Sequence, residues 1–422
     1  MLALAIAVGM LMLSYWVTNQ RLAISGETSL MRNVELVRGW FKPHNTPMAD
    51  SVLLINVAYD TELVNVADAV GIPAGYARIT DRGKLHELLM ELKRDGDYRY
   101  IVLDVIFNND IHTPKDSALF TLIASMDRIV IPRDMKRPLA DSCLYPKAAP
   151  AVYFTNVKFT TFAKYPYIID GEKSLPLRMY EDITGRTVVN HGLFSTDGYR
   201  LARESIVLAF DLRCDSAYTQ EGEKTWYNLG ADLLGSTFIS EGDTIIGDSE
   251  LYDNPSLLRG NYGDDYQGKY RGKYVIIGAF SDGDMHYSYL EDQAGATILF
   301  NAYLSLLHGH HCISAMVLLL LLVAFFFLSY LILGNKTLDA VVTDKMADGG
   351  VLSKYAPAKA GRRMLIVFIS WMGYSVFLSI LCVVTYLLMN EVYDIFVTAT
   401  VFQIISLITS KIYKYKNKKS HV

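Results

Sequence analysis

The sequence lacks the short motifs that mark the common catalytic classes. It contains no GxSxG nucleophile elbow, no GxxxxGK[S/T] phosphate loop, no HExxH zinc motif and no CxxC pair. We therefore expect no catalytic residue and no cofactor, and interpret the chain as a protein that is not an enzyme. Nucleic acid is not an expected partner either. The net charge is −4, and the basic clusters lie beside apolar segments, where anionic lipid explains them.

Cysteine is scarce, with four in 422 residues. Cys312 and Cys382 lie in or next to apolar segments, whereas Cys143 and Cys214 lie in the polar part of the chain. An oxidising compartment would permit a disulfide between Cys143 and Cys214. Spacing alone does not show whether the two meet, so two separate thiols stay open as the alternative.

Charge is absent from four apolar stretches: residues 1–18, 313–333, 364–389 and 395–410, the last needing 392–394 to reach a full span. A helix needs about 20 apolar residues to cross the hydrocarbon core, where backbone groups must be satisfied internally. The sequence therefore predicts a four-helix transmembrane region. Its first helix, 1–18, is expected to be a retained anchor, and its last helix is 392–410. A cleaved signal peptide is the alternative, although no A-x-A site closely follows the first stretch.

Basic residues are unevenly distributed around these stretches. Six lie in the loop 335–363 and five in the tail 411–422, whereas the short connection 390–394 has none. Because loops rich in Lys and Arg stay in the cytoplasm, we expect the region 19–311 on the opposite side. The predicted location is the bacterial inner membrane, with a large periplasmic domain.

The patterns in residues 50–311 predict an α/β domain with a largely parallel sheet. Apolar runs typical of strands buried on both faces lie at residues 51–58, 100–107, 128–132 and 273–279. Segments with helical spacing lie at residues 82–93, 116–125 and 295–307, and Asp116 is expected to cap the second. Alternation of strands and helices implies parallel pairing. Residues 19–49 are expected to form a stalk, and 135–262 an irregular β-rich insertion.

Five blocks of this region, in order, resemble the second type of CHASE domain, the cyclase/histidine-kinase-associated sensory extracellular domain. The blocks are DSVLLINVAYD, ITDRGKLHELLMELKRDGDYRYIVLDVIFNND, KDSALFTLIASMDRIVIP, NHGLFSTDGYRLARESIVLAF and GKYVIIGAFSDGDMHYSYLEDQAGATILFNAYLSLLHG. The resemblance covers about residues 15–335. It departs at Ala294, where the family usually has Pro, and in having no cytoplasmic segment long enough to bury a core.

The resemblance implies a membrane-anchored sensor that binds a ligand or partner outside the cytoplasm. Signal transduction would then pass through its helices to a separate membrane or cytoplasmic effector, and a homo-oligomer is compatible with this role. The alternative is a structural scaffold subunit of a bacterial envelope complex.

Acidic residues stand at or just after the ends of the predicted strands. They are Asp60, Asp104, Asp282 and Asp284, and Arg78 precedes the first predicted helix. Because ligands bind at the carboxyl ends of strands in open α/β sheets, these five residues are candidates for one ligand-binding pocket. A cation or an amine-bearing ligand would suit converging acids. The alternative is that each acid caps a helix or satisfies loop amides.

A cluster of imidazoles precedes the second apolar stretch. His308, His310 and His311, followed by Cys312, form the segment HGHHC. Imidazole and thiolate are zinc ligands, so these histidines are weak metal candidates and, because imidazole titrates near neutrality, pH-sensing ones. Their crowded spacing favours a plain helix junction at the membrane interface. Asp197 and Gly198 predict a structural turn.

Overall fold

The computed structural model describes residues 1–19, 32, 51–67, 73–109, 111–151, 164–208, 211–212, 226–233, 270–280, 284–288, 292–334, 336, 359–389 and 395–420. The chain divides into two compact units. One comprises Met1–Lys42, Val188–Ser205 and His310–Val422, and the other Pro43–Thr187 and Ile206–Gly309. Most of the predicted stalk, and Asp282 and Cys214, lie outside the described residues.

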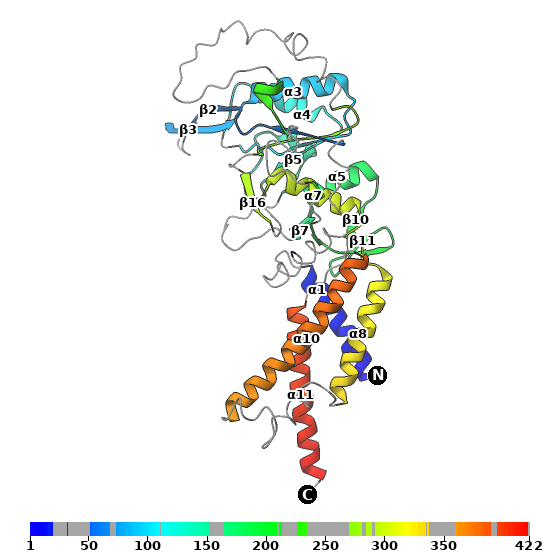
Figure 1. Ribbon diagram of the computed structural model, residues 1–422. Helices are drawn as coiled ribbons and strands as arrows, with labels where there is room; N and C mark the ends of the chain where they lie inside the picture. Colours follow the sequence, from blue (N-terminus) through cyan, green and yellow to red (C-terminus); the bar gives the residue numbers. More distant parts are fainter. Residues whose placement is uncertain are drawn as a thin grey trace, which may run out of the picture. The chain divides into compact units, whose positions relative to one another are not determined.

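The second unit, here the α/β unit, is built on a six-stranded sheet in the order β14–β1–β15–β4–β5–β6 (Figure 1). Every neighbouring pair is parallel, as predicted. The central strand β15 comes last along the chain. The strands are β1 (Val52–Asn56), β4 (Tyr100–Leu103), β5 (Ile129–Arg133), β6 (Ala148–Pro150), β14 (Tyr227–Asn228) and β15 (Tyr274–Gly278).

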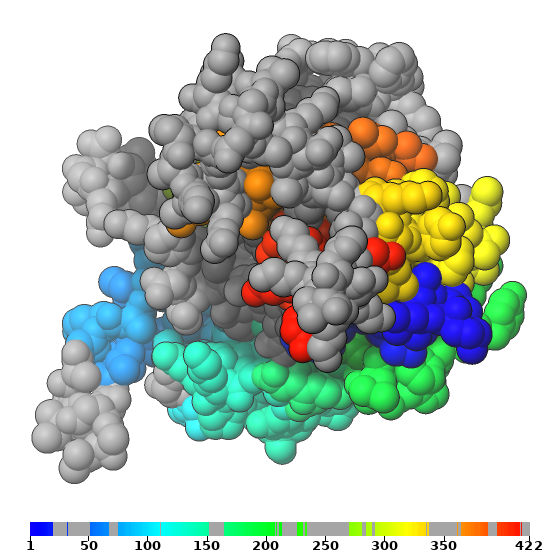
Figure 2. Space-filling view, turned by 90° about the horizontal axis from the view of Figure 1, so that it is seen from below, coloured from blue at the N-terminus to red at the C-terminus, as the bar shows by residue number. Residues whose placement is uncertain are grey.

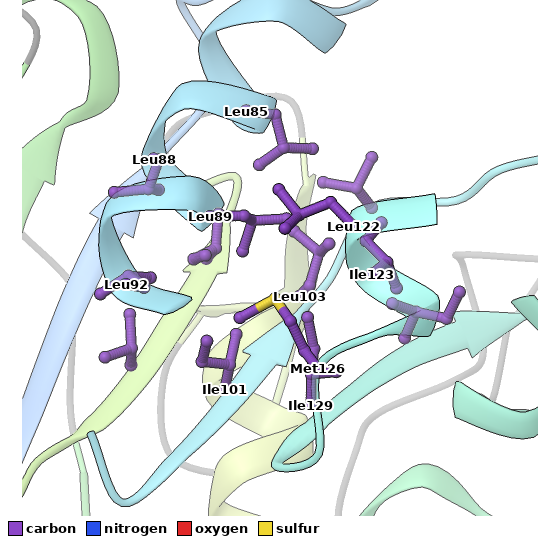
Figure 3. Close-up of a cluster of buried hydrophobic side chains, with 14 of the residues drawn as sticks. Leu85, Leu88, Leu89, Leu92, Ile101, Leu103, Leu122, Ile123, Met126 and Ile129 are labelled. Carbon is purple, nitrogen blue, oxygen red and sulfur yellow. The ribbon is translucent and has the colours of Figure 1, made fainter. Parts of the chain in front are cut away.

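Helices α3 (Arg82–Asp95) and α4 (Asp116–Ala124) cover one face of the sheet. Leucines at helical spacing on α3 meet alternate residues of the strands, including Ile101 and Leu103 (Figure 3). Burying each such side chain contributes about 1.5–3 kcal/mol. The carboxylate of Asp81 caps α3 by accepting hydrogen bonds from the N–H groups of Gly83 and Lys84.

Helices α5 (Leu175–Thr184) and α7 (Gly295–Leu307) pack against each other and cover the other face (Figure 1). Nearly every residue of α7 is buried, which explains why its sequence is apolar on all sides. Its polar Asn301 is satisfied by accepting from the N–H of Leu212 and donating to the carbonyl of the same residue. The predicted helix 295–307 is confirmed.

Several elements were not predicted or differ from the prediction. The hairpin of β2 (Thr61–Ala67) and β3 (Pro73–Thr80) and the helix α5 were missed, and β4 ends four residues early. Asp116 does not cap α4 as predicted. The N-cap is Lys115, and the Asp116 carboxylate instead accepts from the N–H of Thr113.

The remaining short elements of the middle region form small sheets. β7 pairs with β13, β8 with β9, and β16 with β17. Their bounds, with that of the 3-10 helix η2 and the π-helix η3, are β7 (Lys164–Pro166), β8 (Ile168–Ile169), β9 (Glu172–Lys173), β13 (Ser205–Val207), β16 (Met285–Tyr287), β17 (Asp292–Ala294), η2 (Ser142–Lys147) and η3 (Leu229–Leu233).

The first unit, here the helical unit, holds the apolar helices. They are α1 (Leu2–Thr18), α8 (Ala315–Leu333), α10 (Lys359–Met389) and α11 (Phe396–Ser420). Helix α8 packs beside α1 and also contacts α11 (Figure 2). Within the described residues, three segments are long and apolar enough to cross a membrane: Ala315–Leu333, Met364–Tyr386 and Phe396–Tyr413. By the length and composition of these helices, the chain is a membrane protein.

The helical unit also contains a three-stranded antiparallel sheet of β10 (Val188–Asn190), β11 (Ser195–Asp197) and β12 (Arg200–Ala202). Its last two strands meet at the Asp197–Gly198 turn, as predicted, where Gly198 takes a φ of 60°. The hydroxyl of Tyr15 on α1 donates to the carbonyl of Ala202, at 2.9 Å. Helix α1 is thereby joined to this sheet.

Candidate functional site

The α/β unit contains a cavity of about 550 Å³ at the carboxyl ends of its central strands. It opens beside the end of β4 and the first turns of α7, and the β3–α3 connection contributes another wall. This is the position at which open α/β sheets bind ligands. The charged residues that line it are Arg78, Arg82, Asp104, Asp284 and His286.

Two glycines bring the acidic side of the cavity together. A Cβ at Gly278, the last residue of β15, would lie 3.3 Å from the Cβ of Asp104 and 2.8 Å from that of Ala296. A Cβ at Gly295, the first residue of α7, would lie 2.5 Å from Oδ2 of Asp284. The absence of side chains at both positions therefore lets the two carboxylates approach the start of α7, whose dipole favours negative charge.

Two groups on the acidic side of the cavity, Asp104 and His286, have raised pKa values. Burial, followed by the nearby Asp284 carboxylate, raises the pKa of Asp104 to about 7. Nε2 of His286 lies 3.0 Å from Oδ1 of Asp284, and this hydrogen bond raises the pKa of His286 above its usual value. Near neutral pH, this group of side chains can therefore bind or release protons when a charged ligand arrives.

The basic side of the cavity comes from β3 and α3. Nε of Arg78 donates to Oγ1 of Thr61, and the side chain is otherwise exposed. Arg82 is only 4% exposed and stacks over the ring of Phe107, 4.4 Å from its centroid. Its Nε lies 3.5 Å from Asp116, but its Nη1 has no hydrogen-bond partner among the described residues. Burial lowers the pKa of this guanidinium.

Of the five residues predicted to share a pocket, the structure brings together Arg78, Asp104 and Asp284. Asp60 does not line this cavity. It is 4% exposed, and its carboxylate accepts from Nζ of Lys84 and from the N–H of Gly230, each at 2.8 Å. Asp60 therefore satisfies a loop amide and an ion pair, which is the alternative to ligand binding for an acid at a strand end. Asp282 lies outside the described residues.

Arg82 and His286 were missed by sequence reasoning. Arg82 is the first residue of the helix predicted at 82–93, and its burial depends on Phe107 and Asp116, which are distant in sequence. His286 stands two residues after Asp284, within the strand β16. An acid followed two residues later by a histidine is the sequence signal that could have identified His286.

A second cluster lies in the helical unit. Nε2 of His311, Oδ2 of Asp197 and Sγ of Cys312 all lie within 4.8 Å of one another. The side chains of His311 and Asp197 are 1% and 5% exposed. Burial, followed by the Asp197 charge, raises the pKa of Cys312 to about 11, so the group is a thiol near neutral pH.

The other predicted side chains are separate from this cluster. In the α/β unit, Nδ1 of His308 lies 3.2 Å from Asp211, and this contact raises the pKa of His308. His310 does not belong to the group formed by His311. Cys143 lies partly buried on η2. Because Cys214 is outside the described residues, a disulfide between the two stays a prediction.

Comparisons with protein-family models, with curated proteins and with solved structures find no match to this chain. The resemblance to a CHASE domain therefore stays a prediction. What the structure establishes is a class, a membrane protein that carries a parallel α/β unit.

Proposed function

We propose that this chain is a membrane-anchored sensory protein that is not an enzyme. Its α/β unit binds a small ligand in the 550 Å³ cavity and passes the signal to a separate effector protein. The cavity is the observation that carries the proposal, because its volume falls within the range of about 300–1,000 Å³ usual for small-molecule sites. Its position outside the sheet's carboxyl edge supports the same role.

The charges around the cavity favour a ligand that carries both an anionic and a cationic group. The buried guanidinium of Arg82, with Nη1 unpaired among the described residues, is suited to a carboxylate. Arg78 on the neighbouring strand adds a second cation. Asp104 and Asp284 are suited to a protonated amine. A zwitterion such as a free amino acid or short peptide satisfies both sides.

The route of the signal is proposed from chain connectivity. Gly295, Ile298 and Leu299 of α7 line the cavity, and α7 is followed by α8 after only residues 308–314. A ligand that shifts α7 therefore acts on the segment that leads into the membrane. The proposed effector is a separate protein, and the connection between α8 and α10 is too short to bury a core of its own.

We further propose that α1 is a fourth membrane span and that the α/β unit lies outside the cytoplasm of a bacterium. Helix α1 has 17 residues without charge and contacts both α8 and α11. The basic residues of the loop 335–363 and of the tail support this orientation. The test is labelling of intact cells with an impermeant thiol reagent. A Glu87→Cys variant should react and a Lys416→Cys variant should not, in a background free of the native cysteines.

Ligand binding is tested by thermal shift and calorimetry on the full-length protein in detergent, with a panel of amino acids and dipeptides. A ligand should raise the unfolding midpoint, and Arg78→Ala should weaken its binding about 10-fold or more because one charge-assisted hydrogen bond is lost. Asp60→Asn is the matched control and should leave affinity unchanged. A midpoint that no member of the panel raises would contradict the proposal and favour the scaffold alternative.

A further inference from the structure

The segment before α8 lies along the sheet of the helical unit as an added strand. The N–H of Arg203 donates to the carbonyl of His311, and the N–H of Ile313 donates to the carbonyl of Leu201. Ala202 and Cys312 form an antiparallel bridge. This backbone pairing brings His311 and Cys312 to the Asp197 turn, although 114 residues separate His311 from Asp197 in sequence.

The three donor atoms have the separations of a tetrahedral metal site. Nε2 of His311 lies 3.1 Å from Oδ2 of Asp197 and 3.5 Å from Sγ of Cys312, and Sγ lies 3.8 Å from the carboxylate oxygen. Zinc bonds of about 2.0–2.1 Å to oxygen and nitrogen and 2.3 Å to sulfur imply edges of roughly 3.3–3.6 Å. Little movement is therefore needed for all three atoms to contact one ion.

The surroundings suit a cation that replaces a proton. Asp197 and His311 are almost fully buried, so a bound ion would be held in a low-dielectric site by ligands already fixed in place. The carboxylate and thiolate together carry two negative charges, which match a divalent cation.

We propose that Asp197, His311 and Cys312 form a zinc-binding site at the start of α8, with a water molecule as the fourth ligand. On binding, Sγ of Cys312 loses its proton to water and forms a bond to the metal. The imidazole of His311 binds through Nε2 and holds its ring proton on Nδ1. The ion links the β11–β12 turn to the residue pair that precedes α8, and thereby fixes the beginning of that helix to the sheet.

The site is tested with the metal alone, on full-length protein purified in detergent without chelator. Cobalt(II) is a spectroscopic substitute for zinc. It should bind one ion per chain and give a thiolate-to-cobalt charge-transfer band that zinc abolishes by displacement. Cys312→Ser should lose the band, and affinity should fall by at least about 100-fold, as expected when a direct ligand is removed. Cys143→Ser is the matched control and should keep both.

A readout on the unaltered chain covers the case in which Cys312→Ser fails to fold. Zinc should raise the midpoint of thermal unfolding in a concentration-dependent manner, and a chelator should reverse the rise. Asp197→Asn, which keeps the side chain's shape, should reduce that rise. Less than one ion per chain, or a charge-transfer band that survives in Cys312→Ser, would show that the cluster is only a hydrogen-bonded pair beside a thiol.

Discussion

The cavity of the α/β unit and the cluster of the helical unit use similar side chains in opposite ways. In the cavity, Asp284 and His286 are each more than a third exposed and border about 550 Å³ of space. In the cluster, Asp197 and His311 form the same pair of groups at 5% and 1% exposure, with a thiol completing the set. An organic ligand needs room between its polar partners, whereas a metal ion needs donor atoms almost in contact. The spacing of the polar atoms therefore separates the two kinds of site more clearly than their chemistry does.

The contrast between the two sites would not hold if the formation of one depended on the other. The largest effect is expected for Leu89→Ala in α3, where a fully buried side chain is removed from the core of the α/β unit. The free energy of unfolding of this unit should fall by about 2–5 kcal/mol through lost burial and the cavity left behind. Glu87→Ala, exposed on the same helix, should change it by less than about 0.5 kcal/mol.

Denaturant unfolding followed by hydrogen exchange measures both units in one experiment. Cobalt binding at Cys312 should be unchanged in Leu89→Ala, since the cluster is formed within the helical unit. Loss of cobalt binding together with the core would show that the two sites are formed by one cooperative structure.

A smaller effect tests whether Gly295 is required for the cavity's acidic side. Gly295→Ala places a Cβ 2.5 Å from Oδ2 of Asp284 and should cost about 1–3 kcal/mol, as expected for overpacking. Combining it with Asp284→Ala removes the clashing atom, so the loss in the double variant should be smaller than the sum of the two single losses. Additive losses in this double-mutant cycle would contradict the proposed clash.

The most specific effect is a pH dependence of stability. Asp104 keeps its proton to about pH 7 in the folded chain but loses it near pH 4 when unfolded. The folded state thus binds more protons in this window, and the free energy of unfolding falls as pH rises, by at most about 1.4 kcal/mol per unit. The raised pKa of His286 acts in the same direction, because its contribution is full below about pH 6.5 and is lost above its folded pKa.

Asp104→Asn should flatten this profile between pH 4 and 7 and make the chain more stable than the wild type at pH 8. Asp127→Asn, an exposed change on the same unit, should leave the profile as it is. Thermal unfolding at a series of pH values provides the measurement. Identical pH profiles for the wild type and Asp104→Asn would argue that Asp104 is ionised in the folded state.

Local sequence patterns predicted the helices and strands of this fold more successfully than the contacts between distant side chains. The apolar runs at β1 and β15 and the helical spacing of α3 and α7 are visible within single windows of sequence. They specify burial directly, so the strands, helices and parallel sheet could be predicted. The hairpin β2–β3 was missed because its partly exposed strands have no apolar run of that kind.

The sites depended on long-range packing. Asp60 and Asp104 both stand at strand ends, yet only one faces the cavity, because Lys84 and Gly230 bind the other. Nothing within a window of sequence indicates which neighbour an acid will find. In the same way, HGHHC suggested metal ligands, but the carboxylate that completes the group comes from the β11–β12 turn.

The position of β15 has a consequence for the order in which the chain folds. This strand lies between β1 and β4, so the two cannot be joined into one sheet until residues 274–278 have been synthesised. Such late pairing of distant segments slows folding, since a long loop must close first. By then the ribosome is close to α8, so the sheet would close at about the time that helix enters the membrane.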